Sequence, residues 1–228
     1  KREFCQTLIQ ELDAILSGKD NQAPKKIDRE LNSAAEELLL QSKRAPKPLA
    51  HQQTYTIDTV FISENDYFEM IGKKTAVLLK SSAQVGALIG GGTQDEVQRL
   101  GRYAYSAGLA FQIIDDILGL TASEATLGKP IGSDIREGKK TLIMIHARVQ
   151  ATPSQQRQLD NILGNEQASK SQIQSLVDLA TSLGSLDYAH ERARQLITEA
   201  KEELQTFHDT PAKAYLLSLA DYIINRTY

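Results

Sequence analysis

The stretch FQIIDDILGL, Phe111 to Leu120, places two adjacent carboxylates inside an otherwise apolar run. An ionised carboxylate in apolar surroundings is costly unless it is paired or bound to a metal ion. On a helix, Gln112 lies three residues from Asp115 and four from Asp116, so one side presents an amide and two carboxylates. Oxygen ligands of this kind suit hard cations such as Mg²⁺. The alternative is a solvated polar stripe on an amphipathic helix.

The loop that follows, GKPIGSDIREGKKT (Gly128 to Thr141), favours the metal interpretation. It holds three glycines, four lysines or arginines, and Asp134. Glycines let a backbone approach a ligand closely, and lysines supply mobile positive charges for phosphate groups. A carboxylate pair followed by such a loop has the composition expected of a magnesium–diphosphate site, although glycine and lysine are also common in ordinary surface loops. Two further basic candidates, Lys73-Lys74-Thr75 and Lys43-Arg44, read most simply as solvated charges when each is taken alone.

Apolar residues recur at helical spacing along nearly the whole chain, which predicts an all-α protein, most simply a large helical bundle. Asn65 is expected to cap one helix, and the glycines at 90–92 to end it. The prolines at 46 and 48 exclude helix around them, and the residues VFI at 60–62 are the one strand-like run. The spacing predicts helices over about 4–15, 27–38, 66–89, 94–120, 141–150, 154–163, 170–183, 185–206 and 211–225.

Composition narrows the classes of partner. The net charge of −3 over 228 residues gives no general attraction to nucleic acid or to an anionic membrane surface. The single cysteine, Cys5, cannot form an internal disulfide and fits a reducing compartment. We see no signal peptide and no run approaching the ~20 apolar residues of a membrane span. A cytoplasmic protein is therefore expected.

Taken in order, three segments and the tail resemble the all-trans polyprenyl diphosphate synthases, the family that includes farnesyl, geranylgeranyl and heptaprenyl diphosphate synthases. The segments are YFEMIGKKTAVLLKSSAQVGALIGG (67–91), GLAFQIIDDILGL (108–120) and LGKPIGSDIREGKKTLIMIHA (127–147), and the tail ends LADYIINRTY. The resemblance implies one isoprenoid-synthase helical domain over residues 1–228. It also implies a Mg²⁺-dependent prenyltransferase, homodimeric, that joins an allylic prenyl diphosphate to isopentenyl diphosphate.

The resemblance also implies roles for individual residues. Asp115 would bind Mg²⁺ directly, while Asp116 and Asp134 would hold its water ligands. The allylic diphosphate would be bound by Lys74, Lys129 and Lys139. Thr75 and Gln112 would lie beside the carbocation, and Phe111 near the isopentenyl group. The implied catalytic residues are Asp115, Asp116, Lys74, Thr75 and Gln112.

The chain departs from the family pattern in two places. The second Asp-rich motif, usually DDxxD, reads DDILG, with Gly119 in the fifth position. The first Asp-rich motif, followed in the family by a pair of arginines, is absent from these residues. Either a segment of the protein is missing from this sequence, with a junction near residues 42–53, or the deletion is real. Lys43-Arg44 accordingly resembles either the motif that binds isopentenyl diphosphate or the arginines after the first Asp-rich motif.

Two rival functions follow from these departures. A real deletion favours a non-catalytic regulatory subunit of a heteromeric polyprenyl diphosphate synthase. A class I terpene cyclase of related fold is the other rival. The GKPIGSDIREGKKT loop argues against the cyclase, because cyclases usually carry a different second metal motif.

Overall fold

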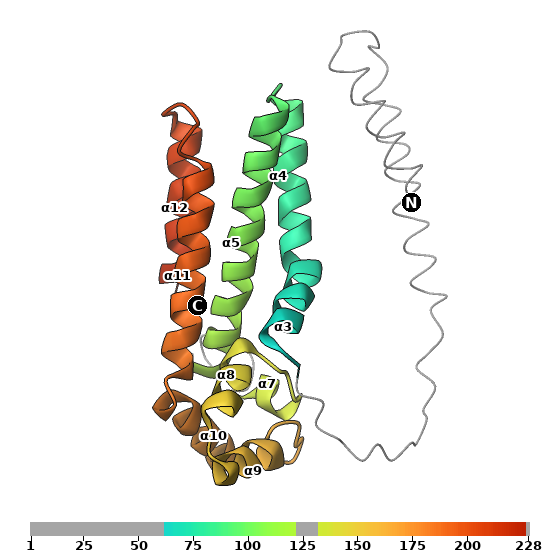
Figure 1. The fold of residues 1–228 in the computed structure, drawn as a ribbon, viewed down its shortest axis with the longest axis vertical. Helices are drawn as coiled ribbons and strands as arrows, with labels where there is room; N and C mark the ends of the chain where they lie inside the picture. Colours follow the sequence, from blue (N-terminus) through green and yellow to red (C-terminus); the bar gives the residue numbers. More distant parts are fainter. Residues whose placement is uncertain (1–61, 122–131, 227–228) are drawn as a thin grey trace, which may run out of the picture. The chain divides into compact units, whose positions relative to one another are not determined.

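The computed structural model describes residues 62–121 and 132–226 (Figure 1). By its internal contacts the chain divides into two compact units, Lys1–Asp58 with Ile89–Gly91, and Thr59–Leu88 with Gly92–Tyr228. Nearly all described residues belong to the second unit. Several predictions lie outside the described residues: the helices over 4–15 and 27–38, the junction near 42–53, the break at the prolines 46 and 48, Lys43-Arg44, Lys129 and all but the last residue of the run at 60–62. The single domain over the whole chain therefore stays a prediction.

The all-α prediction is confirmed, since the described ranges contain helices and no strand. None of these helices is long and apolar enough to cross a membrane. The elements are α3 (Glu64–Ile71), η1 (Gly72–Ala76), α4 (Val77–Ile89), α5 (Gln94–Thr121), α7 (Ser133–Arg136), α8 (Leu142–Gln150), α9 (Pro153–Ile162), α10 (Lys170–Ser182), α11 (Ser185–Glu203) and α12 (Pro211–Asn225).

Side-chain caps set where several helices begin. Thr152 and Ser169 each form a capping box at the start of α9 and α10, in which the cap and the third helical residue satisfy each other's backbone N–H. The prediction of Asn65 as a cap was wrong, because Ser63 caps α3 in the same way with Asp66. The glycine run does end α4: Gly91 has φ +75°, and the Gly92 N–H donates to the Ala87 carbonyl at 2.9 Å.

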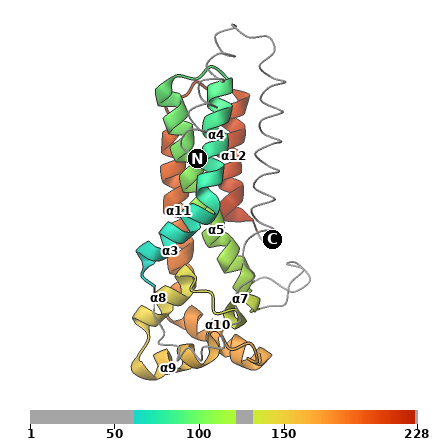
Figure 2. The same ribbon diagram turned by 90° about the vertical axis from the view of Figure 1, so that its right-hand side faces the viewer.

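Helix α5 is the element around which the others pack. Fourteen of its 28 residues are buried, and it lies along α11, with α12 against both. The shorter helices α8, α9 and α10 gather at its C-terminal end, as Figures 1 and 2 show. The Asp115-Asp116 pair lies in the last two turns of α5, so this is the end of the helix where the predicted site belongs.

Small residues bring η1 into close contact with α5. A Cβ atom added at Gly108 would lie 2.8 Å from the Ala76 Cα, and one at Gly72 would lie 2.6 Å from the Tyr105 hydroxyl. Real Cβ atoms do not approach neighbouring atoms so closely, so at Gly108, where the neighbour is backbone, only glycine allows this separation, whereas at Gly72 the Tyr105 side chain would have to move. The abundance of small residues in these segments thus has a direct packing consequence.

We expect Gly108→Ala to lower the free energy of unfolding by about 1–3 kcal/mol, because the added methyl group meets backbone of η1. Urea denaturation followed by circular dichroism measures this. Gly86→Ala is the matched control, since nothing lies within 4 Å of its added Cβ on α4. That variant should be neutral or more stable by up to ~1 kcal/mol through helix propensity. Equal effects of the two substitutions would contradict the close approach.

Candidate active site

A π-helical turn carries the first basic group of the site. In η1 the Val77 N–H donates to the Gly72 carbonyl, five residues back, so one extra residue enters the turn that joins α3 to α4. Such turns change the direction in which neighbouring side chains point and are frequent at functional sites. Here Lys73 pairs with Glu69 on the exposed side, while Lys74 borders a pocket.

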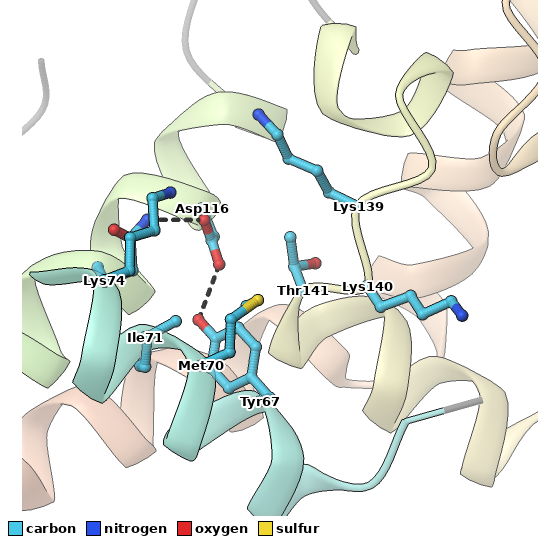
Figure 3. Close-up of a pocket in the computed structure, with 9 residues that line it drawn as sticks. Tyr67, Met70, Ile71, Lys74, Asp116, Lys139, Lys140 and Thr141 are labelled. Carbon is cyan, nitrogen blue, oxygen red and sulfur yellow. Dashed lines mark hydrogen bonds between the residues drawn. The ribbon is translucent and has the colours of Figure 1, made fainter. Parts of the chain in front are cut away.

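The pocket has a volume of about 160 Å³ and lies between α3, η1, α5 and the segment before α8 (Figure 3). Figure 3 shows Lys74 and Lys139 on opposite sides of Asp116. The residues that line the pocket are Tyr67, Met70, Ile71, Lys74, Gln112, Asp116, Lys139, Lys140 and Thr141.

The carboxylate of Asp116 is held by two hydrogen bonds from different helices. The Tyr67 hydroxyl of α3 donates to Oδ2 at 2.7 Å, and Gln112 Nε2, one turn back on α5, donates to Oδ1 at 3.1 Å. The Thr75 hydroxyl of η1 donates in turn to Gln112 Oε1 at 3.0 Å. Hydrogen bonds thus link these four side chains in a row that joins α3, η1 and α5.

Burial raises the pKa of Asp116 to about 6, although the hydrogen bonds from Tyr67 and Gln112 oppose this rise. The neighbouring carboxylates of Asp134 and Asp115 raise that pKa further. Burial and the adjacent Asp116 also raise the pKa of the Tyr67 hydroxyl, which therefore stays a donor at physiological pH. The site accordingly concentrates negative charge that a cation would relieve.

Asp115 faces a different environment from Asp116. Its side chain is 58% exposed, and its Oδ1 lies 3.6 Å from a guanidinium nitrogen of Arg226. Arg226 also donates to the Phe111 carbonyl at 3.0 Å, and its guanidinium carbon lies 4.0 Å from the centroid of the Phe111 ring. The Asp115 carboxylate therefore points towards the end of α12, whereas the Asp116 carboxylate lines the pocket.

On the opposite side of the pocket, Lys139 pairs with Asp134 and, at 3.1 Å, with Glu137. The hydrogen bond to Asp134 raises the pKa of Lys139, which keeps it cationic. Asp134 lies directly against α5: a Cβ atom added at Gly119 would be 3.0 Å from Asp134 Oδ2. The glycine that breaks the DDxxD pattern thus leaves room for a carboxylate from α7.

The oxygen donors of Asp115, Asp116 and Asp134 are of the type that Mg²⁺ prefers, and they act on one another electrostatically. Within residues 62–121 and 132–226, however, no three His, Cys, Asp or Glu side chains lie close enough together to enclose an ion. Their carboxylate oxygens are suitable ligands for a divalent cation, and the three residues would supply part of its coordination shell.

Sequence comparison assigns the family. Residues 11–180 match the family model described as polyprenyl synthetase. The chain belongs to the polyprenyl synthetase family. A geranylgeranyl diphosphate synthase of Methanosarcina mazei is 41% identical over 167 residues, which are 73% of this chain and 50% of that protein. The chain thus spans about half the length of the curated relatives it matches.

Solved structures of the family share the fold. A geranylgeranyl pyrophosphate synthetase of Pyrococcus horikoshii superposes with a TM-score of 0.67 at 39% identity, covering 72% of this chain and 50% of that one. A polyprenyl synthase of Caulobacter crescentus, complexed with calcium and isoprenyl diphosphate, gives a TM-score of 0.70 at 26% identity, covering 95% and 62%. The isoprenoid-synthase fold expected from the resemblance is confirmed.

The structure brings together most of the family residues that it describes. Lys74, Gln112, Asp116 and Lys139 line one pocket, and Thr75 joins it through Gln112. Asp134 does not line the pocket but pairs with Lys139, which does. Asp115 and Phe111 instead contact Arg226. The catalytic roles of these polyprenyl synthetase residues stay predictions.

Three residues of the arrangement were not anticipated. Tyr67 lies seven positions before Lys74, about two helical turns, which is a usable signal for a shared helix face. Thr141 is buried and caps α8 through the Met144 N–H. Arg226 carries no local signal, because its partner Phe111 is 115 residues away.

We expect Asp116→Asn to stabilise the metal-free protein at neutral and alkaline pH. The folded-state pKa near 6 lies above the ordinary value of 3.8, so the stability from Asp116 is complete below about pH 4 and lost as pH rises through 6. Asparagine cannot ionise. The difference in unfolding free energy between variant and wild type should therefore grow by about 1–3 kcal/mol from pH 4 to pH 8.

Glu203→Gln supplies a control of opposite sign. The hydrogen bond from Arg102 lowers the pKa of Glu203, so its contribution is present above its ordinary pKa and lost in acid. This variant should be less stable than wild type at pH 8 and similar at pH 3.5. Urea titrations in chelator-containing buffer measure both, and a pH-independent effect of Asp116→Asn would contradict the raised pKa of Asp116.

Proposed function

We propose that this chain is a trans-prenyltransferase that condenses an allylic prenyl diphosphate with isopentenyl diphosphate, head to tail, to give a longer all-trans prenyl diphosphate. The observation that carries the proposal is the pocket in which Lys74 and Lys139 flank Asp116. The names of the relatives, geranylgeranyl diphosphate synthases among them, support the same reaction.

The pocket has the groups that ionisation of an allylic diphosphate requires. Diphosphate leaves with the bonding electron pair only when its growing negative charge is balanced, and two ammonium groups can do this. The apolar side chains of Ile71 and Met70 line the pocket and would limit the access of water to a carbocation, and the Thr75 hydroxyl donates to Gln112 beside them. Attack by the isopentenyl double bond and loss of a proton complete the condensation.

We assign Mg²⁺ as the cofactor, with Asp115 as direct ligand and Asp116 and Asp134 bound through water. A divalent ion held there would supply Lewis-acid stabilisation of the departing diphosphate. The oxygen donor set supports this choice, as does the Caulobacter relative complexed with calcium and isoprenyl diphosphate. A cytoplasmic homodimer is the proposed form of the protein.

Two observations favour the alternative of a regulatory subunit. The 228 residues contain no first Asp-rich motif, and the described residues contain no complete set of metal ligands. The polyprenyl synthetase match disfavours the terpene cyclase.

The direct test incubates the purified chain with farnesyl diphosphate and labelled isopentenyl diphosphate, with Mg²⁺ or with a chelator. The proposal predicts a longer prenyl diphosphate in the presence of Mg²⁺ and none with the chelator. Asp115→Ala should abolish turnover while circular dichroism stays unchanged. Absence of product from the wild-type chain would overturn the enzyme proposal and favour the regulatory subunit, and full activity of Asp115→Ala would overturn the metal assignment.

We further expect Lys139→Ala to weaken binding of the allylic diphosphate by about 10- to 100-fold, the value of a charge-assisted hydrogen bond. Isopentenyl diphosphate should be affected less. Calorimetric titration with each diphosphate alone measures this. The control variant is Lys201→Ala, which removes a lysine of α11 that pairs with Asp221. Equal weakening of both diphosphates would count against the placement of Lys139.

A further inference from the structure

The end of α12 reaches the carboxylate pair through Arg226, the first residue after the helix. Its side chain is only 9% exposed. One guanidinium nitrogen donates to the Phe111 carbonyl, and the guanidinium carbon lies over the Phe111 ring, 4.0 Å from its centroid. These contacts anchor the end of α12 on α5 and fix where the positive charge lies.

The anchoring does not use the whole guanidinium group. The Nε atom is buried and has no hydrogen-bond partner among the described residues. A buried charged donor without an acceptor is unfavourable, and a contact needed only for packing would not require a charge. The positive charge of Arg226 therefore needs an explanation beyond the stacking of its stem.

The carboxylate of Asp115 supplies that explanation. Asp115 Oδ1 lies 3.6 Å from the Arg226 guanidinium, close enough for electrostatic attraction but too long for a hydrogen bond. Asp115 is also the residue to which the proposed function assigns direct metal coordination. A divalent cation and the guanidinium group would then act on the same carboxylate, and their like charges repel.

We propose that Arg226 is the counter-ion of Asp115 in the metal-free protein and competes with the divalent cation for that carboxylate. This inference rests on the metal site of the proposed function. Arg226 is thus a positioning residue that weakens metal binding at Asp115. Because coupling is reciprocal, metal binding weakens the hold of α5 on the end of α12 by the same factor.

The expected size follows from the geometry. Since Asp115 is more than half exposed, solvent screens the pair, and removal of the Arg226 charge should tighten divalent-ion binding by about two- to fivefold. Arg226→Lys retains the charge and should bind the ion within about twofold of wild type.

The test measures Mn²⁺ binding to the metal-free full chain from the loss of the free-ion electron paramagnetic resonance signal. Arg226→Gln removes the charge, and Arg226→Met is a second neutral variant that keeps an apolar stem over Phe111. Arg102→Gln is the matched control. It removes the same charge from α5 thirteen residues from Asp115, about 20 Å along the helix. Asp115→Asn, alone and combined with Arg226→Gln, reports whether the ion uses Asp115.

The inference predicts tighter Mn²⁺ binding in both neutral Arg226 variants, no change in Arg102→Gln, and no gain from Arg226→Gln when Asp115 is already asparagine. Binding that depends on Asp115 but is equal in wild type and the neutral variants would overturn this inference alone. Equal tightening by Arg102→Gln would overturn it too, as a general charge effect. Binding that does not depend on Asp115 would overturn both this inference and the proposed metal site.

Discussion

The carboxylate of Asp116 holds two parts of the chain together that are 49 residues apart in sequence, because the Tyr67 hydroxyl of α3 donates to it. Gln112 and Thr75 extend this contact to η1. An ionised carboxylate at a partly buried position is unfavourable, and these hydrogen bonds offset only part of that cost. The remaining imbalance appears as the raised pKa. The same imbalance makes this end of α5 attractive to a cation, so the packing of α3 on α5 and the proposed chemistry depend on one group.

The positions of the lysines follow from constraints on the backbone. Gly108 and Ala76 let η1 lie against α5, and the π-helical turn then places Lys74 at the pocket while Lys73 faces solvent. On the other side, Gly119 leaves space for Asp134, which pairs with Lys139. Each side of the pocket thus relies on a glycine of α5: Gly108 lets η1 approach, and Gly119 leaves space for Asp134.

Sequence reasoning predicted the helices well where periodicity and caps agree, as in α5, α10 and α12. It missed α7, whose four residues are too few for a periodic pattern, and misplaced the cap of α3 because Ser63 and Asn65 are both suitable cap residues. The site was predictable as a set of residue types. Which carboxylate faces which neighbour was not predictable. Adjacent positions on a helix point about 100° apart, but only the contacts with Tyr67 and Arg226 reveal that Asp116 faces the pocket and Asp115 faces the end of α12.

The account rests on the claim that Lys74, Lys139 and the α5 carboxylates together bind diphosphate and a divalent ion. A crystal structure of the chain with Mg²⁺ and inorganic diphosphate tests this most directly. The account predicts diphosphate between the Lys74 and Lys139 ammonium groups, with the ion joining it to the Asp115-Asp116 end of α5. Diphosphate bound elsewhere, or an ion that contacts none of the α5 carboxylates directly or through water, would contradict it.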